Sequence, residues 1–351
     1  MQDATQDGPE TTRTSRKDYR EADPEAREIW DMVSQSPLRN LWNFQGIPVG
    51  VVFKRAMNSF LDDNLLSRAA ELGYYFLFAL FPMLVSASAI LGLAAKRASV
   101  IYIELLHYLA LIMPPSAFAL VEETFNQTTA ASTAGKVTFG LVAAIWAASV
   151  GFSAIQDGMN TVYRVKETRP YWKARGSAIL VTMLLSVVIT VTLAMLLVGD
   201  FAAKYARVVL HPYWFAIAVA VLVHAVSIAC AITLLLLLFA TIYYYAPDLK
   251  ANCWLWLTPG AAIGIIGWLL ASFALRLYLH YFNSYSLTYG SLGAVIILLT
   301  WFYITGLMLL IGAEINSEIQ AAVTEKKLKE NGVLPQEATT DKAHPVEALS
   351  H

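Results

Sequence analysis

Six long apolar runs divide the chain, each of about 20 residues or more and without Asp, Glu, Lys or Arg. An α-helix rises about 1.5 Å per residue, so about 20 residues cross a hydrocarbon core about 30 Å thick. The pattern therefore predicts an all-α fold, a polytopic membrane helical bundle with six transmembrane helices. The predicted spans are Leu72–Ala94, Val137–Ile155, Ser177–Gly199, Trp214–Tyr245, Leu255–Leu275 and Leu292–Ala313.

Two further segments have the pattern of helices that lie at a membrane surface. In Val51–Glu71, apolar and charged residues alternate at helical spacing, which predicts an interfacial amphipathic helix that leads directly into the first span. Residues 97–126 hold an apolar run that is short for a crossing and includes Glu104 and His107, so we expect a re-entrant or interfacial helix. The fourth run exceeds the thickness of a bilayer, and we expect Ala225–Tyr245 to be its crossing part.

The composition agrees with a membrane protein, because 57% of the residues are hydrophobic and only 15% are charged. The charged residues lie outside the six runs. Residues 1–45 and 321–351 hold too few apolar residues to bury, and we expect them to be disordered cytoplasmic tails. They flank a six-helix membrane domain at residues 46–320. Because the first apolar run begins only at Leu72, we expect no cleavable secretory signal.

The basic residues predict on which side of the membrane each loop lies. With six spans, 19 of the 25 Lys and Arg residues fall on the side that carries both termini. Positively charged loops stay in the cytoplasm during insertion, so we expect both termini to be cytoplasmic. The bias is strongest in the tails and in the loop Arg164–Arg175.

Polar residues at the ends of the spans are the strongest candidates for function, because ionisable groups are costly in hydrocarbon. Arg68 and Glu71 lie at the start of the first span, and Glu314 and Asn316 follow the sixth span on the same side. We expect these four residues to form a cytoplasmic gate. A local ion pair at the helix ends explains the charges equally well, so both interpretations stand.

Hydroxyl groups line one face of the otherwise apolar third span. Thr182, Ser186 and Thr190 follow one another at intervals of four residues, which places them on one side of a helix and predicts the lining of a polar cavity. The commoner alternative is that each hydroxyl bonds to a carbonyl of its own helix, four residues earlier.

The second predicted cytoplasmic loop combines basic and aromatic residues. Arg169, Lys173 and Arg175 lie next to Tyr171 and Trp172, and basic side chains at this depth attract anionic lipid headgroups. We therefore expect headgroup contacts here and membrane lipids as partners. The alternative is that these charges serve only to orient the protein during insertion.

Small residues recur at intervals of three or four positions in the second and fifth spans. Such residues let helix backbones approach closely, and this packing replaces the hydrophobic force that is absent between helices in lipid. We favour helix packing over a substrate-lining role, and such faces also suit a homo-oligomer. The residues are Gly140, Ala144 and Ala148 in one span and Gly260, Gly264, Gly267 and Ala271 in the other.

A series of short motifs follows a fixed order along the chain: Ser67–Ala70, Tyr74, Tyr75, Phe81, Pro82, Tyr243–Pro247, Pro259–Ala261, Tyr289–Leu292, Trp301 and Gly312–Asn316. In this order they resemble the YihY/BrkB family of bacterial inner-membrane proteins. The resemblance spans about residues 50–320 and all six predicted helices. It implies a multi-pass protein of the bacterial inner membrane with a transport or envelope role, and it supplies no catalytic residues.

The same family has also borne the name ribonuclease BN, and the sequence argues against a nuclease. A zinc-dependent nuclease needs a dense cluster of His and Asp, since the metal must activate water and bind phosphate. The histidines here are scattered, with no two within four residues of each other: His107, His211, His224, His280, His344 and His351. We therefore expect no enzyme activity, no metal, no cofactor and no nucleic-acid partner.

Two functions fit a bundle of this kind. The preferred hypothesis is a transporter that moves lipids or lipid-like anionic amphiphiles. Charge-free spans offer little to a small hydrophilic ion, whereas basic interfacial loops suit a headgroup. Pro82 and Pro259 are candidate hinges for such movement. The alternative is a structural or scaffolding membrane protein without transport activity.

Overall fold

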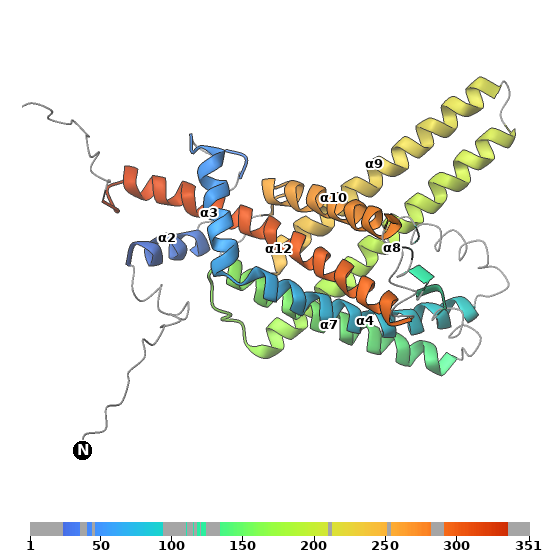
Figure 1. Cartoon of the computed structure of the whole chain (residues 1–351), viewed down its shortest axis with the longest axis horizontal. Coiled ribbons are helices and arrows are strands. Elements are labelled where there is room, and N and C mark those ends of the chain that lie inside the picture. The colour runs from blue at the N-terminus through green and yellow to red at the C-terminus, as the bar shows by residue number, and fades with distance from the viewer. Residues whose placement is uncertain are drawn as a thin grey trace, which may run out of the picture.

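The computed structural model describes seven segments of the chain, together with single residues between positions 110 and 123. The segments are residues 24–35, 41–43, 46–93, 134–209, 213–250, 254–281 and 291–335. All the regular secondary structure in these segments is helical (Figure 1). The predicted all-α class is therefore confirmed for the described residues.

Six long helices coincide with the six predicted spans. Five of them, α7, α8, α9, α10 and α12, are long and apolar enough to cross a membrane. The sixth, α4, covers the first apolar run and contains Pro82, although some of its side chains lie outside the described residues. The chain is thus a polytopic helical membrane bundle. The helices are α4 Leu65–Leu93, α7 Ala134–Val162, α8 Tyr171–Val209, α9 Tyr213–Tyr245, α10 Pro259–Tyr281 and α12 Ser291–Glu330.

Helix α12 occupies the middle of the bundle, where it packs against α4 on one side and α10 on another (Figure 1). Helix α4 also packs along α7, and α7 contacts α8. One end of the bundle holds α2 (Pro24–Gln35), α3 (Val49–Asp62), residues 163–170 and the last turns of α12. We call this the basal end and the opposite end the distal end.

Helices α8 and α9 form a long hairpin that leaves the bundle. They pack against each other, and in Figure 1 the hairpin diverges from α7, α10 and α12 toward the distal end. With 39 and 33 residues, the two helices are about 58 Å and about 50 Å long. None of the residues in the most apolar stretch of α9 is buried. Large apolar side chains are therefore exposed around much of this helix, as expected for a surface in lipid.

Glycines allow the closest helix contacts in the bundle. A Cβ atom added at Gly260 would meet the carbonyl oxygen of Gly312, so α10 and α12 touch backbone to backbone. One and two turns further along α10, Gly264 and Gly267 face Met308. On the other side of α12, a Cβ added at Gly306 would lie 2.9 Å from Cβ of Leu72 in α4. The small residues of α10 thus pack helices, as we favoured from the sequence.

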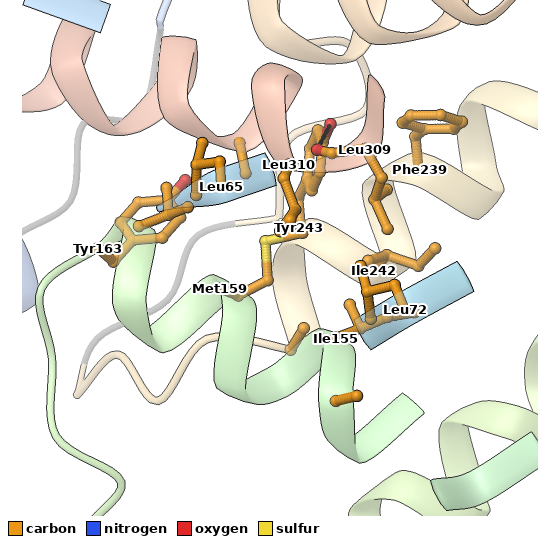
Figure 2. Close-up of a cluster of buried hydrophobic side chains, with 14 of the residues drawn as sticks. Leu65, Leu72, Ile155, Met159, Tyr163, Phe239, Ile242, Tyr243, Leu309 and Leu310 are labelled. Atoms are coloured by element: carbon orange, nitrogen blue, oxygen red, sulfur yellow. Dashed lines mark hydrogen bonds between the residues drawn. The ribbon is translucent and has the colours of Figure 1, made fainter. Parts of the chain in front are cut away.

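The largest apolar core lies where α4, α7, α9 and α12 meet (Figure 2). Its side chains come from helices far apart in the sequence and are buried almost completely. Because the core lies toward the basal end, it holds the spanning helices together there. The residues labelled in Figure 2 include Leu65, Leu72, Ile155, Met159, Tyr163, Ile242, Tyr243, Leu309 and Leu310.

Both tail predictions are wrong in part. Residues 24–35 form helix α2, in which Trp30 and Val33 are buried against the core. At the other end, α12 continues to Glu330, and Val323 and Leu328 are 1% exposed. The prediction relied on the average composition of these segments and overlooked a few apolar residues at helical spacing. Such residues are enough to pack a short helix against a larger core. Residues 1–23 and 336–351 lie outside the described residues.

The predicted single helix Val51–Glu71 is also wrong, because the structure divides it into α3 and α4. The backbone of Asn64 has φ 50°, a left-handed conformation that Asn tolerates better than most residues. Helix α3 therefore ends at Asp62 and lies crosswise to α12 (Figure 1). It keeps the predicted amphipathic character, with Phe53 exposed and Val52 buried. Most of the surface segment predicted at 97–126 lies outside the described residues.

We expect Gly260→Ala to destabilise the protein by about 1–3 kcal/mol, because the new methyl group must push α10 away from α12. The midpoint of thermal unfolding in detergent measures this effect. Gly176→Ala is the matched control, since a Cβ there meets no atom within 4 Å and removal of a helical glycine is neutral or stabilising by up to about 1 kcal/mol. Equal midpoints for the two variants would contradict close α10–α12 packing.

Candidate functional site

A hydrogen-bonded group of three side chains joins the helices at the basal end. Oε1 of Glu318 in α12 accepts a hydrogen bond of 2.7 Å from the hydroxyl of Ser59 in α3. The guanidinium of Arg164 donates to the same two side chains, at 2.9 Å to Ser59 Oγ and 3.3 Å to Glu318 Oε1. It also lies 4.4 Å from the ring centre of Trp30 in α2. We call Ser59, Arg164 and Glu318 the basal hub.

The backbone at the end of α7 positions Arg164. This residue has φ 53°, and the amide of Val165 bonds back to the carbonyl of Asn160 at 2.9 Å. A left-handed residue followed by such a bond is a common way to end a helix, although glycine is usual at that position. The left-handed backbone conformation of Arg164 costs about 1 kcal/mol or more. The contacts of its guanidinium at the basal hub offset this cost.

A second network ties the α7–α8 loop to the end of α9. Arg169 donates to both carboxylate oxygens of Glu167 and to the carbonyl of Ala246 at 3.2 Å. The backbone and hydroxyl of Thr168 both donate to Asp248 Oδ2, and Asn160 accepts from the amide of Asp248 at 2.7 Å. We call this network the loop clamp.

The loop clamp shifts the pKa values of its charged members. The hydrogen bond from Arg169 lowers the pKa of Glu167, and the same bond raises the pKa of Arg169. Burial by itself would raise the pKa of Asp248, but the hydrogen bonds from Thr168 together with the charge and backbone of Arg169 outweigh it, so the pKa of Asp248 is lowered. Both carboxylates are therefore held in the ionised form that the clamp needs.

Asn316 fixes the start of α10 against α12. Its Oδ1 accepts from the amide of Gly260 at 2.9 Å, and its Nδ2 donates to Oγ1 of Thr258 at 2.9 Å. The hydroxyl of Thr258 also caps the amide of Ala261 at 3.0 Å. With Pro259 as first helical residue, this is a strong helix start, which explains why α10 begins four residues later than the predicted Leu255.

A small buried chamber adjoins this cap. It has a volume of about 30 Å³, and polar groups of α9, α12 and two loops line it together with apolar side chains. The hydroxyl of Tyr243 donates across the bundle to the carbonyl of Leu309 at 3.0 Å. Among the described residues, the side-chain oxygen of Gln320 has no hydrogen-bond partner, although this residue is only 4% exposed. The polar lining residues are Tyr163, Tyr243, Tyr244, Thr258, Asn316 and Gln320.

Glu314 is buried in the same layer of the bundle, at 2% exposure. Residues two positions apart lie about 200° apart on a helix, so Glu314 points away from the side of α12 that carries Asn316. Burial raises the pKa of Tyr163, and the nearby negative charge of Glu314 raises this pKa further. Tyr163 thus lines the chamber and also lies within electrostatic reach of Glu314.

The four predicted gate residues do not share one environment. Arg68 and Glu71 form a half-exposed ion pair of 3.4 Å within α4, which is the local pairing we named as the alternative. Asn316 is a buried helix cap, and Glu314 is buried in α12. The spacing of the sequence could not assign the four residues to helix faces. Their role as a gate stays a prediction.

Two of the three predicted hydroxyls of α8 follow the alternative that bonds them to their own helix, whereas the buried hydroxyl of Thr182 has no hydrogen-bond partner among the described residues. Ser186 donates to the carbonyl of Thr182 at 2.8 Å, and Thr190 donates to that of Ser186 at 2.7 Å. Ser186 and Thr190 are exposed on the outside of the described structure, whereas Thr182 is buried. The chamber at the start of α10 does not include them. In an apolar surrounding, a helical hydroxyl most readily donates its hydrogen bond to the carbonyl four residues earlier in its own helix.

Two of the three predicted headgroup contacts already bind protein groups. Arg169 belongs to the loop clamp, and Arg175 lies 4.5 Å from the ring centre of Trp146 and donates to Ser153 at 3.3 Å. Lys173 is exposed. Of the three basic residues, it is the one that the structure presents to its surroundings.

Sequence reasoning missed the basal hub and the chamber. Glu318 lies one helical turn beyond Glu314 on the same face of α12, and this spacing was the available signal for a polar face in that helix. Arg164 looked like one basic loop residue among several. Gln320 carried no signal, because it lies in a segment that we assigned to the end of the membrane domain.

The fold and the buried polar groups at its basal end define a multi-pass helical membrane protein. The family model described as Virulence factor BrkB matches residues 56–334. The chain therefore belongs to the BrkB family, as the resemblance of its motifs indicated.

Individual relatives agree with this assignment. The chain is 33% identical over 262 residues to YfkH of Bacillus subtilis, a protein described by name as ribonuclease-like, and the match covers 72% of this chain and 88% of that protein. It is 27% identical over 272 residues to a UPF0761 membrane protein of Stenotrophomonas maltophilia, covering 75% of this chain and 59% of the relative. A UPF0761 membrane protein of Xanthomonas campestris shows 27% identity over 271 residues, with the same coverage. No solved structure matches the chain significantly.

We expect Glu318→Gln to destabilise the protein by about 1–3 kcal/mol, because it leaves Arg164 without its charged acceptor at the basal hub. Chemical or thermal unfolding in detergent measures the change. Glu330→Gln is the matched control in the same helix, since Glu330 is 60% exposed and lies 3.8 Å from Lys326; there we expect less than about 0.5 kcal/mol. A smaller loss for Glu318→Gln than for the control would contradict the hub.

The loop clamp is expected to open in acid. Because the folded pKa values of Glu167 and Asp248 are lowered, their stabilising contribution is complete above the unfolded values of about 4. It is lost as the pH falls through the lower folded values. The protection of amides at residues 163–170 against hydrogen exchange, taken relative to the intrinsic rate at each pH, should therefore fall below about pH 4 while the core of α12 stays protected. Protection that is equally high at neutral and acidic pH would refute this prediction.

Proposed function

We propose that this protein translocates lipids or other amphiphiles across the bacterial inner membrane, with the basal end and both termini in the cytoplasm. One observation carries the proposal, namely the contrast between the two ends of the bundle. The basal end is joined by the basal hub, the loop clamp and the α10 cap, whereas the α8–α9 hairpin diverges toward the distal end (Figure 1).

The diverging hairpin provides an apolar surface that a lipid can follow. Exposed residues such as Val221, Leu222 and Val226 point in different directions around α9, because successive residues are turned by about 100°. Acyl chains can therefore contact this helix on more than one side. A transported amphiphile would keep its tails in lipid along α8 and α9, so only the headgroup needs a path through the protein.

The buried polar groups supply features of that path. Glu314 is an ionisable residue in the interior of the basal end, and such residues in membrane helices commonly mark substrate or ion pathways. The start of α10 at Pro259, where the amide of Gly260 bonds to Asn316, resembles the helix ends at which many transporters bind. Movement of α10 relative to α12 would change the surroundings of both residues.

The proposal assigns membrane lipids as partners and no nucleic acid. It also assigns no enzymatic role. Among the described residues, no group of three or more His, Cys, Asp or Glu side chains is placed to hold a metal ion. A cytoplasmic basal end follows from the positive charge of its loops and tails.

A scaffolding role is the second candidate, and the uncovered faces of α9 favour it. A second copy of the chain could cover these faces, and the protein would then act as a homo-oligomer without a transport cycle. Such a protein would form a stable oligomer in detergent and would leave lipid movement unchanged.

The test is lipid exchange in vesicles that contain the purified full-length protein and headgroup-labelled lipids. A membrane-impermeant reductant quenches the outer leaflet, so the rate of further quenching reports translocation. We expect faster quenching than in protein-free vesicles and a loss of about tenfold or more with Glu314→Gln, which corresponds to about 1.4 kcal/mol in the barrier. The control is Glu28→Gln, an exposed residue of α2.

Two outcomes would count against the proposal. Quenching no faster than in protein-free vesicles, for both neutral and anionic lipids, would favour the scaffold. Fast quenching with full activity of Glu314→Gln would keep translocation but remove Glu314 from the path.

A further inference from the structure

Helix α3 carries a row of exposed apolar side chains. Its members are four positions apart, so they follow one another along one side of the helix. Each of them is at least 47% exposed. The neighbouring side of α3, which includes Val52 and Ala56, is buried against the bundle. We call the exposed residues Val49, Phe53, Met57 and Leu61 the α3 row.

A salt bridge shows which way the α3 row faces. Arg55 pairs at 2.8 Å with Glu325, which lies in the last turns of α12 at the basal end. Residues two positions apart are turned by about 200° on a helix, so Phe53 faces away from the side on which Arg55 lies. The α3 row therefore faces the membrane-spanning parts of the bundle rather than its basal surface.

The direction of α3 suits a helix that lies in the plane of a membrane. It runs crosswise to α12, which is long and apolar enough to span (Figure 1). The exposed polar residues Lys54, Asn58 and Asp62 form a second row beside the apolar one, turned from it by about 100°. An apolar side next to a polar side is the pattern of a helix that buries one side at the membrane interface.

The exposed apolar surface continues from the end of the α3 row onto a spanning helix. Leu66, in the first turn of α4, is 47% exposed. Tyr74 and Phe78, about two and three turns further along α4, are exposed as well. The α3 row thus adjoins the side of α4 that faces lipid.

Two exposed tryptophans lie near the start of α3. Leu41 packs against Val52 of α3, and the indole of the next residue, Trp42, donates to the carbonyl of Leu257 at 3.0 Å. Trp42 is 51% exposed and Trp256 is 63% exposed, directly before the spanning helix α10. Tryptophan is enriched where membrane and water meet, and the start of a spanning helix lies at that boundary.

We propose that the α3 row, Trp42 and Trp256 form one surface that docks into the lipid leaflet at the basal end, with acyl chains as its partner. The surface is continuous with the lipid-facing side of α4 and reaches the start of α10, so lipid is the occupant that fits its surroundings. The attraction is apolar, because the exposed charges of Lys54 and Asp62 are opposite in sign. Neutral and anionic lipids therefore serve equally well.

The docked leaflet acts on the basal hub through α3. Ser59 lies on the buried side of this helix and donates to Glu318 of α12, so α3 joins the lipid on one side to α12 on another. The inference does not depend on the proposed translocation, since a scaffolding protein would dock in the same way.

Spin labels on single cysteines test the docking in the full-length protein in vesicles, with both native cysteines replaced by serine. Labels at Phe53→Cys and Met57→Cys report on the α3 row, and labels at Asn58→Cys and Asp62→Cys are matched controls on the same helix. Oxygen concentrates in lipid, whereas a nickel chelate stays in water. We expect oxygen to reach the row and nickel the controls, with the row about 5–10 Å below the headgroup boundary, in neutral and anionic vesicles alike.

Two results would overturn the proposal. A row that nickel reaches as readily as it reaches the controls faces water. A row that neither reagent reaches is covered by protein, either a second copy or another segment of this chain. Because neither readout depends on lipid exchange, a row in lipid together with unaccelerated quenching would fail the proposed function alone.

A second pair of variants tests whether the leaflet holds α3 in place. The double variant Phe53→Gln, Met57→Gln removes apolar contact and leaves the buried side intact. We expect the protection of α3 amides against hydrogen exchange in vesicles to fall by about tenfold or more. Lys54→Gln with Asn58→Gln places the same two side chains in the polar row and should leave the protection unchanged. Equal protection in both double variants would overturn the hold of the leaflet on α3.

Discussion

The need to satisfy buried polar groups within the protein governs the basal end of this bundle. In the buried interior of this end little water reaches a backbone amide or a side chain, so each polar group must find a partner inside the protein. Arg164 provides such a partner for α3 and α12 together, because one guanidinium reaches both Ser59 and Glu318. Asn316 does the same for the amide of Gly260 at the start of α10. The positions of four helices at the basal end thus depend on a few polar contacts.

Close packing complements these polar contacts along α12. Lipid tails are as apolar as leucine, so helices in a membrane gain little from hydrophobic burial and associate through van der Waals contact. Gly260 and Gly312 allow α10 to touch α12, and Gly306 receives Leu72 of α4. Helix α12 is therefore held from two sides. The α8–α9 hairpin has a close contact of its own, because a Cβ at Gly199 would meet Ser227, and this contact joins α8 to α9 rather than to the bundle.

The sequence predicted the fold well because the period of apolar residues is a strong signal in a membrane protein. All six runs coincide with helices, and the motif Gly312–Asn316 lies at a buried junction. Contacts between helices were harder to predict. The spacing of Ser186 and Thr190 was correct, yet the face they share is exposed. Arg164 reaches the basal hub because its backbone is left-handed. Neither composition nor spacing predicts that conformation at an arginine.

The proposed translocation would divide its requirements between the two ends of the bundle. A seal against water has to be rigid, because a single opening lets ions leak, and the basal hub, the loop clamp and the contact of Gly260 with Gly312 lie at one end. A path for lipid tails has to be apolar and open to the bilayer, which suits the exposed faces of α9. Glu314 lies within the rigid end, where a change in its charge would alter the contacts of α12.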